Sequence, residues 1–461
     1  SANYDQPIAI PTGGVKLSFW YKTAKPGHET IVTFGHRDAN DNWMSGRNND
    51  MHLTGDGTWQ HFERDIKSFP EGAKAFTLGL WATLWSEAGT ATGTIWYDDL
   101  TITALADGKT LLSADFESTL RPDQLKPTFD FTAWDKALAK AFDEYHFNSL
   151  YVPVQGMGGG TFFSRVEPEL LGFREGTPEF AAAFTAYWQG IEAHLKAKGW
   201  LDKAYVYWFD EPDPKDYAFV MAGMKRLKQA APGIRRMLTE QVEPELVDGP
   251  NLWCPISNEF RQAPADQRMA AGDRFWWYVC TGPKAPYCTL FIDHPATELR
   301  CWLWQTWQRK ISGILVWESN YWTSPSAYPD QRQNPYEDCM SWVSGYDTAA
   351  GTKQAWGNGD GRFIYPPEAA ADAKPAGPVL DGPVDSLRWE MLRDGIEDYE
   401  YLALLQRAVA KLPAAQRAQY EPLLAVPPAV TTDAVTFTRD PAPIEAHRLE
   451  VARALERIGT P

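Results

Sequence analysis

Cysteine is scarce in this 461-residue chain, and the five cysteines present follow no metal-binding pattern. Their odd number and the lack of any CxxC spacing argue against a structural zinc site and leave room for one or two disulfides at most. Cys280 and Cys288 are the nearest pair in the sequence. A disulfide-rich or zinc-stapled scaffold is therefore excluded.

Positive charge is also in deficit. The chain has 44 Lys and Arg against 60 Asp and Glu, which gives a formal net charge of −16 at pH 7. Nucleic acids and anionic membrane surfaces are bound by basic patches, so this balance argues against both as partners. No apolar run reaches the roughly 18 residues of a membrane-spanning helix, so we expect no membrane insertion. No secretion signal is visible in the sequence, which begins with Ser1 rather than Met. We expect an extracytoplasmic or secreted location.

Aromatic residues are what the sequence has in excess. They make up 13% of the chain, and 21 of them are Trp. Cores seldom need so many Trp residues, because the side chain is bulky and its indole N–H needs a partner. Flat apolar rings with a polar edge suit the faces of sugar rings. The composition therefore favours a protein that handles carbohydrate.

Residues 1–120 have the pattern of an all-β domain. Short alternating segments such as "GVKLSFWYKT", "ETIVTFGHR" and "GTIWYDDLTIT" lie between turns, which predicts an antiparallel sandwich. The segments "GTWQHFERDI" and "WYDDLTIT" resemble those of the jelly-roll carbohydrate-binding modules that accompany glycosidases. In such a module Trp43, Trp81 and Trp85 are candidates to stack on sugar; a packed structural spacer is the alternative.

From Phe129 onward, predicted strands alternate with amphipathic helices. Strands are expected within 149–155, 204–209, 235–241, 251–257, 275–280 and 312–319. This alternation predicts parallel pairing with right-handed crossovers. The fold class is therefore multidomain: a jelly-roll β-sandwich, then a (β/α)8-type barrel with a C-terminal helical region over 121–461. Six strands are fewer than the eight of a full barrel, so the first two lie upstream or the barrel is incomplete.

Local signals mark two of the helices. Thr132 and Asp135 form a capping-box pattern at the start of "TAWDKALAKAF". Thr177 and Pro178 begin a second helix, which Gly199 ends. Its apolar face is expected to consist of Phe180, Phe184, Trp188, Ile191 and Leu195. The segment "GMGGG" lacks the residues of a phosphate-binding loop and is predicted to be a flexible rim near the pocket.

Two adjacent carboxylates end the aromatic strand in "KAYVYWFDEPDP". Active sites of (β/α) barrels lie at the C-terminal ends of the strands, where Asp210 and Glu211 fall. Neighbours in a regular strand point to opposite faces, so both acids reach one ligand only if the strand has already ended. Pro212 favours this, because it restricts Glu211 and stops the ladder.

Adjacent acids suit the substrate-assisted cleavage of a 2-acetamido sugar. The acetamido oxygen of the substrate attacks the anomeric carbon, so no nucleophile from the enzyme is needed. In this hypothesis Asp210 stabilises the oxazolinium charge, while Glu211 protonates the leaving oxygen and later deprotonates water. Two like charges so close help to keep one proton on the pair near neutrality.

The chain resembles glycoside hydrolase family 123, the β-N-acetylgalactosaminidases, over roughly residues 129–405. The matching stretches are "YWFDEP", "YVCTGPKAPYCTLFIDHPATELRCWLWQTW", "GILVWESNYW", "GNGDGRFIYPP" and "SLRWEMLRDGIEDYEYL". The resemblance implies the Asp210–Glu211 pair and a sugar pocket walled by aromatic residues. It also implies a retaining hydrolase, without metal or organic cofactor, that releases β-linked N-acetylgalactosamine or a related 2-acetamido sugar from a glycan.

Other residues near the strand ends are candidates for substrate binding, with packing as the competing interpretation. They are Gln155, Asn258, Tyr278, Trp317, Asn320 and Trp322. Glu211 paired with Glu318 or Glu259 would instead make a conventional two-carboxylate glycosidase of other specificity. A non-catalytic glycan-binding protein is the alternative from a different class.

Two further groups of residues are expected to be structural. Charged residues of the late helical region also match the family, but a helix in that position favours ion pairs that anchor the barrel. These are Arg388, Arg393, Glu397 and Asp398. His294 lies closest to a strand end among the histidines, yet it has no ligand spacing and is assigned to no metal.

Overall fold

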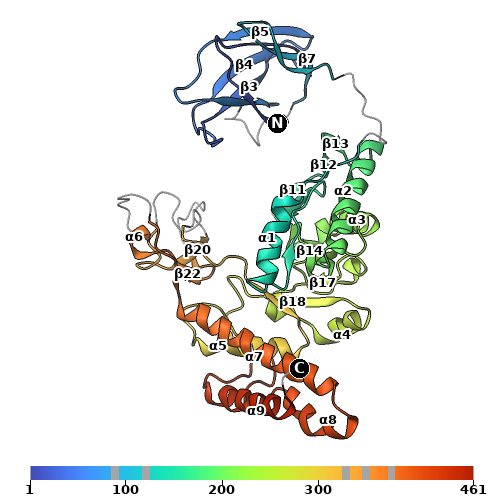
Figure 1. Ribbon diagram of the computed structural model, residues 1–461, viewed down its shortest axis with the longest axis vertical. Helices are drawn as coiled ribbons and strands as arrows, with labels where there is room; N and C mark the ends of the chain where they lie inside the picture. Colours follow the sequence, from blue (N-terminus) through green and yellow to red (C-terminus); the bar gives the residue numbers. More distant parts are fainter. Residues whose placement is uncertain are drawn as a thin grey trace. The chain divides into compact units, whose positions relative to one another are not determined.

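The chain divides into two compact units, Ser1–Arg121 and Pro122–Pro461. The computed structural model describes residues 2–84, 93–116, 125–162, 164–323, 333–344, 354–371 and 379–459. Each unit has a hydrophobic core of its own, and the first unit is blue in Figure 1. The two units are therefore described one after the other.

Two antiparallel four-stranded sheets make up the first unit. Their strand orders are β1-β6-β3-β4 and β5-β2-β7-β8. The strands are β1 (Ala2–Ala9), β2 (Val15–Thr23), β3 (His28–Arg37), β4 (Asn49–Gly55), β5 (Gln60–Ile66), β6 (Ala75–Leu80), β7 (Ile95–Ala104) and β8 (Thr110–Ala114). Alternate side chains of β2, from Val15 to Tyr21, are buried in one core with Phe34 of β3 and Phe76 of β6. The predicted all-β domain is confirmed, while a jelly-roll connectivity stays a prediction.

A parallel sheet of six strands forms the centre of the second unit (Figure 1). Its strands follow one another in sequence order: β9 (Leu150–Tyr151), β14 (Ala204–Val206), β16 (Arg235–Leu238), β17 (Leu252–Trp253), β18 (Arg274–Tyr278) and β19 (Gly313–Leu315). Five of them lie within a predicted strand, β18 begins one residue before the predicted range 275–280, and every pairing between them is parallel. Over the described residues the sheet is a curled half barrel with β9 and β19 at its edges. Closure into a (β/α)8 barrel stays a prediction.

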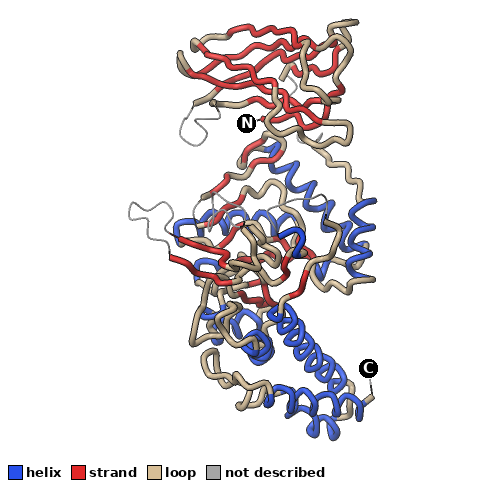
Figure 2. The backbone as a smooth tube through the Cα atoms, turned by 90° about the vertical axis from the view of Figure 1, so that its left-hand side faces the viewer, coloured by secondary structure: helices blue, strands red, loops and turns tan. Residues whose placement is uncertain are grey.

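Helices alternate with these strands along the chain. They are α1 (Thr132–Asp143), α2 (Pro178–Ala197), α3 (Tyr217–Ala230), α4 (Gln262–Ala270) and α5 (Thr297–Gln308). Side chains on one face of the sheet, such as Val206 and Trp277, share one core with Trp188 of α2 and Trp302 of α5. The helices, blue in Figure 2, therefore cover one face of the sheet, and side chains of the other face, such as Met237 and Tyr278, form a separate cluster.

The two predicted helix starts have different outcomes. Thr177 accepts a hydrogen bond from the N–H of Phe180 and caps α2, as predicted, and all five predicted apolar positions are buried. The capping box at Thr132 and Asp135 is wrong. Phe131 is the N-cap residue of α1 and makes no side-chain cap. Asp135 instead binds His194 and Lys198, each at 2.6 Å, so it ties α1 to the end of α2.

A small second sheet lies beside the main one, with the order β11-β10-β15. Its strands are β10 (Gly159–Thr161), β11 (Arg165–Val166) and β15 (Phe209–Asp210). Gly160 pairs with Phe209, and a Cβ at this glycine would lie 2.6 Å from the Phe209 ring. The "GMGGG" segment, predicted to be a flexible rim, therefore contributes its last two glycines to a strand that supports Asp210.

Short elements complete the unit. The remaining strands are β12 (Glu169–Leu170), β13 (Phe173–Arg174), β20 (Met340–Ser344), β21 (Gln354–Asn358), β22 (Ile364–Tyr365) and β23 (Val384–Asp385). The short helices are η3 (Leu201–Lys203), η4 (Pro214–Asp216), η5 (Pro244–Leu246), η6 (Ser257–Glu259), α6 (Glu368–Ala371) and η7 (Glu421–Leu424). The C-terminal region consists of α7 (Leu387–Ala410), α8 (Ala414–Tyr420) and α9 (Ala442–Ile458), orange to red in Figure 1. Within the described part of the chain, no helix has the length and apolar character to cross a membrane.

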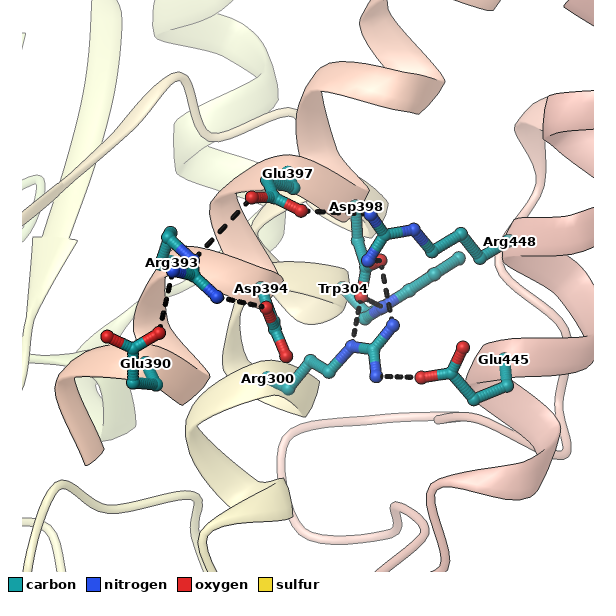
Figure 3. A network of polar contacts seen from close by, with 9 residues as sticks. All are labelled: Arg300, Trp304, Glu390, Arg393, Asp394, Glu397, Asp398, Glu445 and Arg448. Atoms are coloured by element: carbon teal, nitrogen blue, oxygen red, sulfur yellow. Dashed lines mark hydrogen bonds and ion pairs between the residues drawn. The ribbon is translucent and has the colours of Figure 1, made fainter. Parts of the chain in front are cut away.

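A buried ion cluster fastens α7 to α5 and α9 (Figure 3). Asp398 accepts hydrogen bonds from Arg300 Nε at 2.6 Å and from Trp304 Nε1 at 2.8 Å, and Arg448 lies 3.2 Å away. At the start of α7, Arg388 donates to the carbonyl oxygens of Leu290, Gly359 and Arg362. The predicted structural ion pair is thus confirmed for Asp398, whereas Arg388 is structural through hydrogen bonds to backbone carbonyls and has no ion pair among the described residues.

The other two predicted members of this set, Arg393 and Glu397, lie on the surface of α7. Arg393 forms ion pairs with Glu390 at 2.7 Å and with Glu397 at 3.6 Å. Glu397 also accepts from Arg448 at 2.9 Å. Both residues therefore make structural ion pairs as well, but in a solvated setting.

Candidate active site

The strand that carries the two acids ends at Asp210, which pairs with Thr161 of β10 as the last residue of β15. Glu211 has φ +43°, in the left-handed region that a residue with a side chain seldom adopts. Because Glu211 has left the extended conformation, the strict alternation of neighbouring side chains no longer applies to it. Pro212 follows at once. The predicted end of the strand between the two acids is confirmed.

Asp210 is held by hydroxyl groups. Tyr207 donates to its Oδ1, and Thr239 Oγ1 donates to the same oxygen at 2.9 Å. The hydroxyls of Tyr207 and Thr239 also lie 3.3 Å apart. The carboxylate is half-buried, and the contacts of the described residues give it no cation as partner. Two donors on one oxygen suit an ionised carboxylate, which can only accept.

Glu211 has a different environment, although it is the next residue. Tyr278, at the end of β18, donates a hydrogen bond to its Oε1. Burial raises the pKa of the Glu211 carboxyl, the hydrogen bond from Tyr278 lowers it in part, and the charge of Asp210 raises it further. Of the two acids, Glu211 is therefore the one whose surroundings favour keeping a proton.

Thr239 connects the two acids. Its Oγ1 accepts the backbone N–H of Glu211 at 2.8 Å and donates to Asp210. Glu240 follows it, and burial together with the charges of Glu243 and Glu211 raises the pKa of Glu240 to about 7. The sequence interpretation missed both residues. The available signal was their place at the end of "RRMLTEQ", which is the same position that Asp210 and Glu211 occupy in the preceding strand.

Aromatic and sulfur side chains pack together on the inner face of the sheet, below the acids. Met237, Leu252, Cys254 and Tyr278 are buried there, with Tyr207 and others packed against them. All five cysteines of the chain are free, so the Cys280–Cys288 pairing considered from the sequence is not formed. Burial raises the pKa values of the Cys254 and Cys280 thiols, so neither is prepared to act as a thiolate nucleophile.

Trp317, Asn320 and Trp322 lie together in the segment after β19, where their contacts are with the protein itself. Trp317 Nε1 donates to Asp360 at 3.1 Å, and Trp322 Nε1 donates to the carbonyl of Ile364 at 2.8 Å. Asn320 pairs with Arg362 in an isolated bridge. These contacts attach the segment to the turn of the "GNGDGRFIYPP" stretch. A role in substrate binding stays a prediction for all three.

Gln155 and Asn258 make no contact with the two acids. The carbonyl of Gln155 accepts from Trp188 Nε1 at 3.1 Å, and Gln155 borders a cavity of about 450 Å³ that Leu170 and Tyr187 also line. Asn258 lies on η6 and donates to Glu259 at 2.8 Å. Of the six predicted substrate-binding residues, the structure brings Tyr278 alone into hydrogen-bond contact with Asp210 or Glu211.

The alternative second carboxylates, Glu318 and Glu259, have hydrogen-bond partners other than Asp210 and Glu211. Glu318 accepts from the N–H of Ser319 and borders a cavity of about 630 Å³ between β19 and α7, lined in part by Trp389 and Arg393. Glu259 is exposed on η6. Among the described residues, no group of three or more His, Cys, Asp or Glu could hold a metal ion. His294 pairs with Glu298 at 3.1 Å.

In the first unit, Trp43 is exposed, Trp81 is half-buried, and Trp85 lies outside the described residues. Three other Trp side chains share one outer face. Trp20 is paired with His61 on one side and Asp98 on the other, and Trp96 is paired with Lys22 in the next row of that face. Trp59 lies directly before β5 and two residues before His61. Side chains two residues apart in an extended segment point to the same side, so we group Trp59 with this face. Trp20, Trp59 and Trp96 are 40%, 45% and 45% exposed; we call them the indole face.

Two carboxyl groups of different environment at the end of one strand suit a glycoside hydrolase, which combines a carboxylate with a carboxylic acid. Comparison with known families agrees. The model "Glycoside hydrolase 123, catalytic domain" matches residues 166–405, which is more than half of the chain. The chain belongs to glycoside hydrolase family 123.

Solved structures resemble both units at low identity. A family 123 glycoside hydrolase from Clostridium perfringens, described in a study of glycolipid glycan hydrolysis, is 14% identical, with a TM-score of 0.41, over 97% of this chain and 92% of that one. A family 16 carbohydrate-binding module is 19% identical, with a TM-score of 0.14, over 21% of this chain and 63% of that one. A family 11 module of a cellulosomal cellulase from Clostridium thermocellum is 15% identical, with a TM-score of 0.16, over 24% and 65%. No curated protein matches the chain.

Proposed function

We propose that this glycoside hydrolase is a retaining enzyme that releases β-linked N-acetylgalactosamine, or a related 2-acetamido sugar, by substrate-assisted catalysis. The observation that carries the proposal is the unequal environment of two adjacent acids. Hydroxyl donors converge on Asp210, while burial raises the pKa of Glu211. Family membership and the sequence resemblance supply the sugar.

In the first step, the acetamido oxygen of the substrate attacks the anomeric carbon and the glycosidic bond breaks. Glu211 gives its proton to the leaving oxygen, and Asp210 accepts the amide N–H and balances the positive charge of the oxazolinium. In the second step, water attacks the anomeric carbon from the opposite side to the ring-closed oxygen. Glu211 takes the proton of that water, and the acetamido group is restored. Two displacements leave the configuration unchanged.

The test compares two chromogenic substrates that differ at one position. The purified chain is given an aryl 2-acetamido-2-deoxy-β-galactoside and the matching aryl β-galactoside with a 2-hydroxyl. We expect turnover of the acetamido substrate, with the β-anomer of the free sugar seen first by NMR. Hydrolysis of the 2-hydroxy sugar alone would show a conventional carboxylate pair, such as Glu211 with Glu318 or Glu259. Glycan binding without turnover of either substrate would show the non-catalytic alternative.

The first unit supports a second function, the binding of glycan chains. The supporting observation is the indole face, because three exposed indoles with Lys22, His61 and Asp98 between them offer flat apolar rings beside hydrogen-bonding groups. Retention of this protein on immobilised glycans tests the function, and the expected behaviour of its variants is argued below.

A further inference from the structure

We infer that Thr239 is a positioning residue, whose one hydroxyl determines which of the adjacent acids is presented as the charged group and which as the acid. The inference rests on the proposed function. Thr239 directly follows β16 and is almost fully buried, at 4% exposure, so it has no solvent to bind instead. It lies 28 residues from Glu211 in the sequence and was not a candidate there.

The hydrogen-bond directions at Thr239 are fixed by chemistry. A backbone N–H can only donate, so the Thr239 oxygen must accept from Glu211, at 2.8 Å. The single proton of the hydroxyl is then available for Asp210 Oδ1, at 2.9 Å. The Glu211 N–H thus orients the hydroxyl, and the oriented hydroxyl points its proton at Asp210. A group that cannot both accept and donate would break this chain of contacts.

Among the described residues, no cation takes the place of the Thr239 hydroxyl as a partner of Asp210. Within the described residues neither acid has an ion pair, and the titratable groups around them are Tyr207, Tyr278, Cys254, Cys280 and Glu240. Burial raises the pKa of each of these groups, so none of them supplies positive charge. Hydroxyl donors from Tyr207 and Thr239 are therefore what stabilises the charge of Asp210. Oδ2 has no hydrogen bond to the described residues and is left for the amide N–H of the substrate.

Thr239 also acts on the second acid through its backbone. Glu211 holds φ +43°, a strained conformation, and its N–H is fixed by the Thr239 oxygen. Loss of the Thr239 hydroxyl therefore frees the Glu211 backbone at the same time as it removes a donor from Asp210. One side chain sets the direction of both carboxyl groups.

The experiment compares Thr239→Val, which keeps the shape and removes the hydroxyl, with Thr239→Ser, which keeps the hydroxyl. On the aryl 2-acetamido glycoside, we expect kcat of T239V to fall on the order of 10²-fold, because small misplacements of catalytic groups have effects of this size. T239S should stay within a few-fold of wild type. Recovery of kcat in T239S, together with its loss in T239V, would identify the hydroxyl rather than the side-chain volume as the group that matters.

Thr306→Val is the matched control. Thr306 is also buried, and its hydroxyl likewise accepts from one group, Trp277 Nε1 at 2.9 Å, and donates to another, the Trp302 carbonyl at 2.7 Å. T306V should lower the melting temperature and leave kcat within a few-fold of wild type. Equal activity of T239V and wild type, or equal losses in T239V and T239S, would overturn the inference while leaving the proposed function intact.

A structural measurement tests the positioning role of Thr239 separately from the proposed function when turnover is absent. If wild type hydrolyses no 2-acetamido glycoside, the proposed function fails. Crystal structures of T239V and T239S still report on the positioning role, because they show the two carboxyl groups directly. We expect Glu211 to leave the left-handed region in T239V and to keep it in T239S. An unchanged Glu211 backbone and Asp210 rotamer in T239V would overturn the inference by itself.

Discussion

At the scale of single residues, the site depends on a local departure from strand geometry. A non-glycine residue at φ +43° is strained by roughly 1–3 kcal/mol, and the surroundings must hold it there. Thr239 binds the N–H of Glu211 and Tyr278 binds its carboxyl group, so both ends of the residue are fixed. The strained backbone frees the two neighbouring acids from the strict alternation of a regular strand, as the proposed mechanism requires.

Tyr278→Phe tests the acid role of Glu211 through pH. The Tyr278 hydrogen bond lowers the pKa of Glu211, while burial raises it more. Removing the donor should raise the pKa of Glu211 further. A general acid must be protonated, so the basic limb of the kcat/KM–pH profile should move to higher pH, by about 1 unit for one charge-assisted hydrogen bond. Tyr205→Phe, on the same inner face but against Trp276, is the control and should not move the limb. A basic limb that stays or moves down in Y278F would argue against Glu211 as the acid.

The leaving group separates the roles of the two acids. Substrates with very good leaving groups need little protonation, so Glu211→Gln should lose little activity on them, whereas Asp210→Asn should still lose activity because the oxazolinium charge is unchanged. On poor leaving groups both variants should be strongly impaired, each by about 10²-fold or more. Hydrolysis rates of a series of aryl glycosides provide the measurement. Equal losses for the two variants on the best leaving group would contradict this division of roles.

Asp210 and Glu211 could be proposed from the sequence, because their adjacency, the aromatic strand and Pro212 all lie within one short stretch. Tyr278 could be proposed from its place near a strand end. Thr239 could not be proposed as a partner of both acids, because its role depends on contacts between neighbouring strands and on the rotamer of one hydroxyl. Such contacts leave no periodic signal. The same limit applies to Glu240, whose raised pKa comes from burial.

At the scale of elements, prediction succeeded where the local signals and the packing agree. The six parallel strands and α2, with its cap, apolar face and end, are recovered from the sequence pattern. The predicted capping box at Thr132 and Asp135 is wrong because the Asp135 carboxylate forms ion pairs with His194 and Lys198 of another element instead of bonding to the start of its own helix. The sequence pattern predicts one strand where the structure has two, β14 and β15, because the aromatic run from Tyr205 to Phe209 is continuous. The break comes from a change of partner: β14 pairs with β16, and β15 pairs with β10.

Asp398→Asn tests the anchoring of α7. Asp398 is 1% exposed and accepts from Arg300 and Trp304 (Figure 3). Loss of its charge leaves the buried Arg300 guanidinium with Glu445 as its remaining acidic partner, so we expect the free energy of unfolding to fall by about 3–5 kcal/mol. Denaturant unfolding measures the change. Arg393→Ala on the same helix is the control; Arg393 is 61% exposed, and exposed pairs contribute about 1 kcal/mol or less. A small loss in D398N, similar to that of R393A, would show that the cluster does not anchor the helix.

At the scale of the whole molecule, the two proposed functions fall in two compact units with separate cores. The acids, Thr239 and Tyr278 all belong to the second unit, and the indole face belongs to the first. A small aryl glycoside should not need the first unit for turnover. A long or surface-bound glycan should, because a second binding site raises the local concentration of glycan near the acids. Substitutions in one unit should therefore leave the task of the other unchanged.

The triple variant Trp20→Ala, Trp59→Ala, Trp96→Ala tests this separation. Its retention on immobilised glycans should fall at least about 10-fold, since each stacked ring contributes roughly 1 kcal/mol, while kcat/KM on the aryl 2-acetamido glycoside stays at the wild-type value. Glu211→Gln should behave in the opposite way, binding glycan and losing turnover of substrates with poor leaving groups. Trp43→Ala is the matched control, because Trp43 is 59% exposed but bridges to Arg37 of the other sheet. If W43A weakens retention and the triple variant does not, the glycan surface is the one predicted from the sequence and the indole face has another use. If neither variant changes retention, the first unit binds no glycan through these rings, and the catalytic unit must hold its substrate alone.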